Sequence, residues 1–124
     1  MNAADLLAGQ RVVPVVVIDD ADDAVPLART LLASGLAAIE VTLRTEAGLE
    51  AIERIANEVP GMLVGAGSVR RAAHFAEVKA AGAVFAVSPG SSDSLLDAAA
   101  GAELPFIPGA VTASEMLKLL DLGY

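Results

Sequence analysis

The sequence predicts an α/β fold built on a parallel β-sheet. Short segments rich in Val, Ile, Leu and Phe alternate with longer segments of helical periodicity along the whole chain. Residues 12–18 form an almost continuous β-branched run, which is typical of a strand buried on both faces. Turn residues follow several of the strand-like segments directly. Strands that alternate with helices in this way call for parallel pairing and right-handed crossovers.

The expected elements can be placed in order. The predicted strands are short and apolar, and they cover residues 12–18, 38–45, 62–67, 84–87 and 105–109. A short helix over residues 3–9 precedes them, and the remaining helices cover 46–58, 70–81, 92–100, 113–122 and a segment that ends at about residue 34. Asp19, Asp20 and Asp23 supply capping and first-turn acids for the helix that ends at about residue 34. Thr112 and Glu115 have the spacing of a capping box.

Two architectures fit this order of elements. Short βα repeats with polar or turn residues at the strand ends favour a (β/α)₈ barrel, and weak self-similarity between residues 33–39 and 80–86 agrees with repeated units. A flavodoxin-like open parallel sheet of about five strands fits the length of 124 residues better. Both remain open at this point.

Composition excludes several classes of protein. A net charge of −8 leaves no basic face for nucleic acid, and the absence of cysteine excludes disulfides and thiolate metal sites. A single histidine, His74, cannot form a histidine metal cluster. No apolar run reaches the ~20 residues that cross a bilayer, and the N-terminus lacks the basic start of a signal peptide. We therefore expect a cytoplasmic protein without membrane or nucleic-acid partners.

The strand over residues 38–45 carries the most informative pattern. A period of two places Glu40, Thr42 and Arg44 on one face and Ile39 with its apolar neighbours on the other. A carboxylate and a guanidinium on one face of an otherwise apolar strand form either a structural ion pair or one wall of an active site. The barrel favours the second interpretation, because active sites lie at the carboxyl ends of its strands.

Other candidates are weaker. The segment from Gly65 to Ser68 ends a strand, and its glycines could make room for a ligand while the Ser68 hydroxyl binds an anion. A tight turn explains it equally well. His74, Lys79 and Lys118 fall within predicted helices and not at strand ends, which disfavours a catalytic role for each.

Five motifs together resemble the KDPG/KHG aldolases, which act on 2-keto-3-deoxy-6-phosphogluconate and 4-hydroxy-2-oxoglutarate. In the order and spacing of that family, the motifs are Val12-Val13-Pro14-Val15, Glu40-Val41-Thr42-Leu43-Arg44-Thr45, Gly65-Ala66-Gly67-Ser68-Val69, Ser88-Pro89-Gly90 and Ile107-Pro108-Gly109. The resemblance implies a (β/α)₈ barrel, usually a homotrimer, and class I aldolase chemistry that uses a lysine Schiff base and needs no metal or other cofactor.

The resemblance also implies roles for individual residues. Glu40 matches the general acid/base, and Arg44 matches the residue that binds the pyruvyl carboxylate. Ser68 stands where the family usually has threonine, and Pro89 matches an apolar contact beside the substrate. The expected products are pyruvate with glyceraldehyde 3-phosphate or with glyoxylate.

The family's Schiff-base lysine lies on a sixth strand, and this chain ends at Tyr124 before that position. A complete barrel has ~250 residues and at minimum about 200. We therefore expect residues 1–124 to form a single domain, the N-terminal portion of an aldolase barrel with about five βα units. Such a chain would be inactive alone and would associate with itself or with a partner that supplies strands. The alternative function is a non-catalytic half-barrel that binds a carboxylate or serves in assembly.

Overall fold

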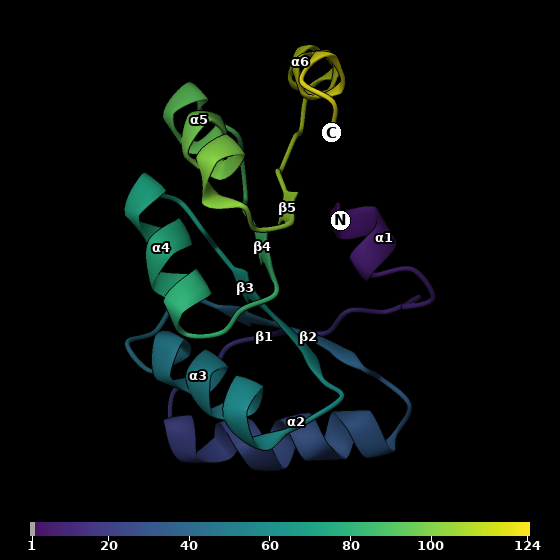
Figure 1. Cartoon of the computed structure of the whole chain (residues 1–124), viewed down its shortest axis with the longest axis vertical. Coiled ribbons are helices and arrows are strands. Elements are labelled where there is room, and N and C mark those ends of the chain that lie inside the picture. Colours follow the sequence, from purple (N-terminus) through teal and green to yellow (C-terminus); the bar gives the residue numbers. More distant parts are fainter. Residues whose placement is uncertain (1) are drawn as a thin grey trace.

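Five parallel strands form one sheet in the order in which they occur along the chain (Figure 1). The computed structural model describes residues 2–124. The strands are β1 (Val15–Val16), β2 (Ala38–Thr42), β3 (Leu63–Gly67), β4 (Phe85–Val87) and β5 (Phe106–Ile107). The helices are α1 (Ala3–Leu6), α2 (Ala24–Ala33), α3 (Gly48–Glu58), α4 (Ala72–Ala80), α5 (Asp93–Ala102) and α6 (Ala113–Asp121), and a 3₁₀ turn η1 (Ala21–Asp23) precedes α2.

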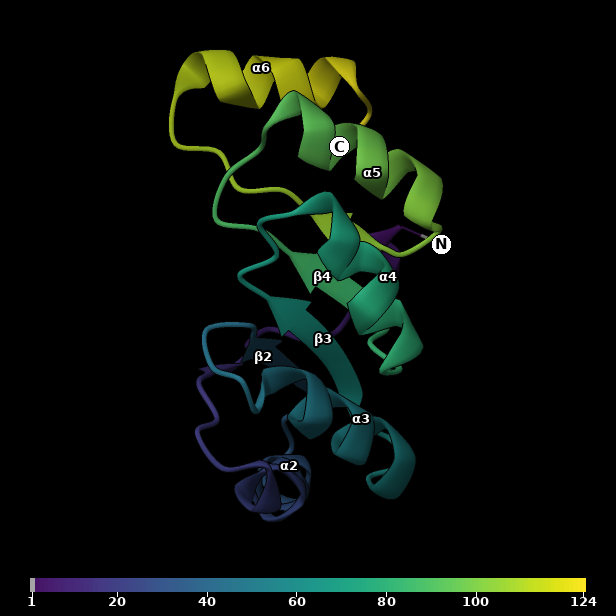
Figure 2. The same cartoon turned by 90° about the vertical axis from the view of Figure 1, so that its left-hand side faces the viewer.

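The strand order decides between the two expected architectures. A flavodoxin-like sheet has the order 2-1-3-4-5, because its chain reverses direction once across the sheet. The observed order is β1-β2-β3-β4-β5, so the flavodoxin-like alternative is wrong. Figure 2 shows α3, α4 and α5 in front of one face of the curved sheet, and Figure 1 shows α1 on its other side. The fold is an open part of a (β/α)₈ barrel.

The helix-covered face of the sheet forms the hydrophobic core. Ile39 and Val41 of β2 are fully buried there against Ile52 and Ile55 of α3. At the β5 end the Phe106 ring packs edge-on against Phe75 of α4, with 5.1 Å between the ring centroids. Burial of each such side chain contributes about 1.5–3 kcal/mol, so this layer holds the open sheet together.

Strand β1 differs from its prediction. Residues 12–18 are expected to be buried on both faces, yet Val15 and Val17 are 56% and 49% exposed while Ile18 is 3% exposed. The reason is position: β1 pairs only with β2, and the concave face beside it is open to solvent in residues 2–124. The expectation that this strand is buried on both faces is therefore wrong for this sheet, in which only one face of the segment is covered.

Most predicted helices are present with shorter ends. The capping box is confirmed, since the Thr112 hydroxyl accepts from the Glu115 backbone and the Glu115 carboxylate accepts from the Thr112 backbone. Asp20 caps η1 through the Asp22 N–H, whereas Asp23 makes no side-chain cap at α2.

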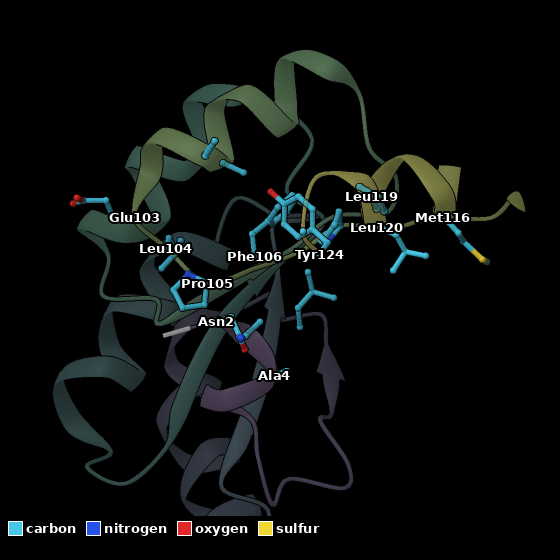
Figure 3. A pocket seen from close by; sticks show the side chains of 16 residues that line it. Asn2, Ala4, Glu103, Leu104, Pro105, Phe106, Met116, Leu119, Leu120 and Tyr124 are labelled. Carbon is cyan, nitrogen blue, oxygen red and sulfur yellow. The ribbon is translucent and has the colours of Figure 1, made fainter. Parts of the chain in front are cut away.

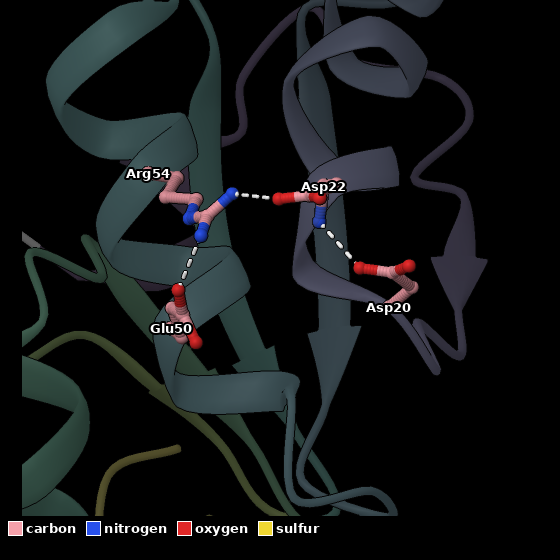
Figure 4. Close-up of polar contacts among 4 residues, drawn as sticks. All are labelled: Asp20, Asp22, Glu50 and Arg54. Atoms are coloured by element: carbon pink, nitrogen blue, oxygen red, sulfur yellow. Dashed lines mark hydrogen bonds and ion pairs between the residues drawn. The ribbon is translucent and has the colours of Figure 1, made fainter.

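An exposed ion-pair group ties η1 to α3. The Arg54 guanidinium lies 2.6 Å from an Asp22 carboxylate oxygen and 2.5 Å from a Glu50 carboxylate oxygen (Figure 4). Exposed ion pairs of this kind contribute little to stability, so this group makes a local contact between η1 and the first turns of α3.

Candidate active site on the concave face of the sheet

Glu40 lies on the concave face of the sheet, in the middle of β2. The sheet register pairs it with Val15 of β1 and with Gly65 of β3, so its side chain extends across β3 toward the strand's carboxyl end. A Cβ atom at Gly67 would lie 1.9 Å from Oε1 of Glu40. The carboxylate therefore occupies space that exists only because residue 67 has no side chain.

Burial changes the acidity of this carboxyl group. Partial burial raises the pKa of Glu40 above its ordinary value of 4.5, and the positive charge of Arg44 opposes that rise. Desolvation penalises the ionised form more than the nearby guanidinium stabilises it. A carboxyl group with a raised pKa holds its proton nearer to neutral pH, which suits a group that both donates and accepts protons.

Glu40→Gln is expected to stabilise the protein near neutral pH, with an advantage that grows as the pH rises. A carboxyl group whose pKa is higher in the folded state contributes stability that is present below its unfolded pKa and lost as the pH rises through the folded value. For Glu40 this loss of stability begins near its ordinary pKa of 4.5, which is the value in the unfolded chain. Urea denaturation of both proteins at several values from about pH 3.5 to about pH 8 measures the difference. A difference that stays constant across this range contradicts the raised pKa.

Arg44 and Ser68 meet at the mouth of the site. β2 ends at Thr42, earlier than predicted, and the exposed Arg44 lies in the turn two residues beyond it. The Arg44 Nε–H donates to the Ser68 hydroxyl oxygen at 3.0 Å. Ser68 follows β3 with a φ of 57°, a left-handed conformation that turns its hydroxyl toward Arg44. Ser68 is the only hydrogen-bond partner of the Arg44 side chain within residues 2–124, so the terminal guanidinium N–H groups are available to an anion.

Pro89 belongs to a rigid pair of loops that follow β4 and β5. The buried Ser88 hydroxyl donates to the Gly90 carbonyl at 2.7 Å and accepts from the Gly109 N–H at 3.3 Å. A Cβ atom at Gly109 would lie 2.5 Å from the Pro89 carbonyl, so the two loops are in close backbone contact. These contacts fix the backbone around Pro89, which is itself exposed.

The structure assigns the strand glycines a role that differs from the expected one. They are predicted to make room for a ligand, but the space at Gly67 holds the Glu40 carboxylate and the space at Gly65 holds the Phe85 ring. Phe85 is fully buried, and its ring lies over Gly65, two residues before the position where the Glu40 carboxylate lies over Gly67. Sequence reasoning missed Phe85 because its partner across the ladder is a glycine twenty residues earlier.

Thr42 also lies on this face. Its side chain is fully buried, and its hydroxyl has no hydrogen-bond partner among the described residues.

The remaining chemical candidates lie on helices, as expected. His74 is buried in α4, where its Nδ1 lies 3.2 Å from the Arg70 backbone N–H, and burial lowers its pKa. The ammonium group of Lys79 donates to the Ala102 carbonyl at 2.8 Å, and that of Lys118 pairs with Asp93. Within residues 2–124, no group of three carboxylate or histidine side chains is placed to hold a metal ion. None of the helices in this part of the chain has the length and apolar character needed to cross a bilayer.

Comparison with known proteins identifies the family. The family model for KDPG and KHG aldolase matches residues 4–124. A 2-dehydro-3-deoxy-phosphogluconate aldolase of Pseudoalteromonas atlantica is 48% identical over 100% of this chain and 58% of its own length. The KHG/KDPG aldolase of Escherichia coli K12 is 47% identical over 98% of this chain and 57% of its own length.

Solved structures agree with this assignment. The KDPG aldolase of Legionella pneumophila, with pyruvate captured as a covalent carbinolamine intermediate, superposes on 100% of this chain with a TM-score of 0.94 and 43% identity. The superposition covers 60% of that aldolase. A KDPG aldolase of Zymomonas mobilis gives a TM-score of 0.93 at 41% identity, covering 99% of this chain and 59% of its own. The chain belongs to the KDPG and KHG aldolase family, and it spans less than two thirds of the length of these relatives.

Proposed function

We propose that this chain provides the proton-transfer and carboxylate-binding part of a class I aldolase site. In this proposal Glu40 is the general acid/base, Arg44 and Ser68 bind the pyruvyl carboxylate, and Pro89 contacts the substrate. The substrate is 2-keto-3-deoxy-6-phosphogluconate, which is cleaved to pyruvate and glyceraldehyde 3-phosphate, or 4-hydroxy-2-oxoglutarate, which is cleaved to pyruvate and glyoxylate. Homotrimeric assembly and a cytoplasmic location belong to the same proposal.

The position of the Glu40 carboxylate supports the proposal best, because this carboxylate lies over Gly67 and close to Arg44. The carboxyl group is partly buried with a raised pKa, while the neighbouring guanidinium keeps its terminal N–H groups free within residues 2–124. Retro-aldol cleavage needs a group that takes the proton of the substrate hydroxyl as the C–C bond breaks, and a group that holds the keto-acid carboxylate. Glu40 and Arg44 have the chemistry that these two tasks need, and Arg44 is near enough to act on the charge of the Glu40 carboxylate.

The covalent step needs a lysine amine that condenses with the substrate ketone and releases water. Lys79 and Lys118 are the lysines of the chain, and both are engaged on helices outside the concave face. We therefore propose that these 124 residues bind a keto acid without forming a Schiff base.

Pyruvate is expected to shift the NMR signals of Arg44 and Ser68, and Arg44→Ala is expected to abolish those shifts. Arg29→Ala is the matched control, because Arg29 is an arginine on α2 whose hydrogen-bond partner among residues 2–124 is the Glu58 carbonyl alone. Borohydride added to the pyruvate complex is expected to leave the intact mass unchanged.

Two outcomes count against the proposal. Pyruvate shifts that persist in Arg44→Ala would remove Arg44 from carboxylate binding. A pyruvyl mass increase on Lys79 or Lys118 would show that the chain forms a Schiff base with its own lysine.

The second candidate is a carboxylate-binding or assembly module without catalysis. The Arg44–Ser68 pair favours it, since this pair is complete within the described residues whereas a nucleophile is not among them. The two functions differ in one measurement: the first predicts aldolase activity once the remaining part of a barrel is supplied, and the second predicts none.

A further inference from the structure

The Thr42 hydroxyl is a buried polar group that lacks a partner. Its Oγ1 atom is inaccessible to solvent and makes no hydrogen bond within residues 2–124, and the whole side chain is fully buried. An unpaired buried hydroxyl is costly, and native proteins rarely keep one without a reason. The hydroxyl therefore calls for a partner close to β2.

Two cavities within residues 2–124 do not supply this partner. An apolar groove of about 920 Å³ lies between α1, β5 and α6 (Figure 3), and its walls include Phe106 and Tyr124. A smaller cavity of about 350 Å³ lies beside the loops that follow β3 and β4, with Arg70 and Ser92 in its walls. No residue of β2 lines either of them, so a ligand in these cavities would leave the Thr42 hydroxyl unpaired.

The Glu40 carboxylate lies beside Thr42. Both residues are on the same face of β2, and the sheet register places Gly67 of β3 directly opposite Thr42. The carboxylate fills the space of the missing Gly67 side chain, because a Cβ atom there would lie 1.9 Å from Oε1 and 2.7 Å from Cδ of Glu40. Neighbouring strands are ~4.8 Å apart, so this carboxylate takes the place of the side chain next to Thr42.

The Glu40 carboxylate also lacks a hydrogen bond. Burial and the charge of Arg44 shift the pKa of Glu40, and no hydrogen bond within residues 2–124 contributes. On the β1 side, Val15 is the register partner of Glu40 and Val17 follows the strand, so β1 offers no polar side chain to this face. A hydroxyl that can donate and a carboxylate that can accept therefore lie next to each other, and neither is paired.

We infer that Thr42 is a positioning residue, whose hydroxyl turns about χ1 to pair with the Glu40 carboxyl group and holds it over Gly67. The χ1 angle has staggered rotamers, and a turn of about 120° moves the hydroxyl to the place of the methyl group. A hydroxyl donates to an ionised carboxylate and accepts from a protonated one, so the pair persists in both protonation states. The contact rests on the sheet geometry, and only its use in catalysis rests on the proposed function.

Thr42→Val tests the contact, because valine keeps the branched shape of threonine and removes the hydroxyl. A carbon-detected NMR titration of the Glu40 carboxyl group in the 124-residue chain is expected to give a pKa about one pH unit above the wild-type value, since a hydrogen bond is stronger to the ionised form. Thr42→Ser keeps the hydroxyl and is expected to restore the wild-type pKa.

Thr45→Val is the matched control. The Thr45 hydroxyl donates to the Ile18 carbonyl, a contact that does not involve Glu40. This variant is expected to lower the urea midpoint and to leave the pKa of Glu40 unchanged. An equal rise of that pKa in Thr42→Val and Thr45→Val would overturn the inference, because general loosening of the fold would then explain it.

Urea denaturation at about pH 8, where Glu40 is ionised, gives an independent measurement. Thr42→Val is expected to lower the urea midpoint in wild type but not in the Glu40→Ala background, where the hydroxyl has no carboxylate to lose. A hydroxyl that stays unpaired gives the opposite sign, because its replacement by a methyl group removes a buried unsatisfied polar group.

Three results would overturn the inference: a higher urea midpoint in Thr42→Val, an unchanged Glu40 pKa in that variant, or a serine that fails to restore the pKa. Neither measurement uses substrate or turnover. A failure of the proposed function would appear in the pyruvate experiment with Arg44→Ala and would leave this test unaffected.

Discussion

Gly65→Ala is expected to lower the free energy of unfolding by about 1–3 kcal/mol, the usual cost of overpacking a core. A Cβ atom at residue 65 would lie 2.3 Å from Cε2 and Cζ of Phe85 and 2.5 Å from its Cδ2. The Phe85 ring is fully buried, so it cannot move aside without displacing its neighbours. Urea denaturation monitored by circular dichroism measures the loss.

Two further variants make this prediction specific. Gly101→Ala is the control: Gly101 lies within α5 with nothing near its added methyl group, and alanine there should leave stability unchanged or raise it by up to about 1 kcal/mol. In the Phe85→Leu background, Gly65→Ala should cost much less, because the smaller side chain leaves room. Equal costs in the two backgrounds would mean that the Gly65–Phe85 contact is not the cause.

Gly67→Ala is expected to change the site and to leave the fold nearly intact. The added Cβ would lie 1.9 Å from Oε1 of Glu40, which is the far end of a flexible side chain. The carboxylate should therefore swing off β3 into solvent, at a cost in stability within about 0.5 kcal/mol. Because burial raises the pKa of Glu40, its release should return that pKa toward 4.5.

A carbon-detected NMR titration of the Glu40 carboxyl group in wild type and in Gly67→Ala measures this change. Gly65→Ala is the informative comparison, since it adds the same methyl group to the same strand face two residues earlier, where it meets Phe85 and not Glu40. An unchanged Glu40 pKa together with a large loss of stability in Gly67→Ala would contradict the prediction.

The contrast between Gly65 and Gly67 separates the two layers of the concave face. The lower layer, with Phe85, fills the interior and holds β3 to β4. The upper layer, with Glu40, lies at the carboxyl ends of the strands beside Arg44 and Ser68. Stability and proposed chemistry thus depend on neighbouring glycines of a single strand, and one substitution in each layer tests them separately.

Much of the candidate site can be predicted from sequence because it depends on local geometry. Glu40 and Thr42 lie on one face because the side chains of β2 alternate, and the capping box at Thr112 and Glu115 needs only a spacing of three residues. Arg44 is predicted on the same strand, but β2 ends at Thr42 and Arg44 lies in the turn that follows. The placement of His74 and Lys118 within helices follows from periodicity in the same way. The catalytic roles of Glu40, Arg44, Ser68 and Pro89 remain predictions that the proposed experiments address.

The sequence by itself determined the alternation of strands and helices, because helical and extended periodicities are carried by residues close together in the chain. Only the tertiary structure decided the strand order, the exposure of Val15 and Val17 at an open edge, and the positions of Glu40 over Gly67 and Phe85 over Gly65. These features depend on which strands become neighbours and in which register, and residues twenty or more positions apart set both. The raised pKa of Glu40 follows from that placement, since burial is a property of the assembled sheet and not of the strand alone.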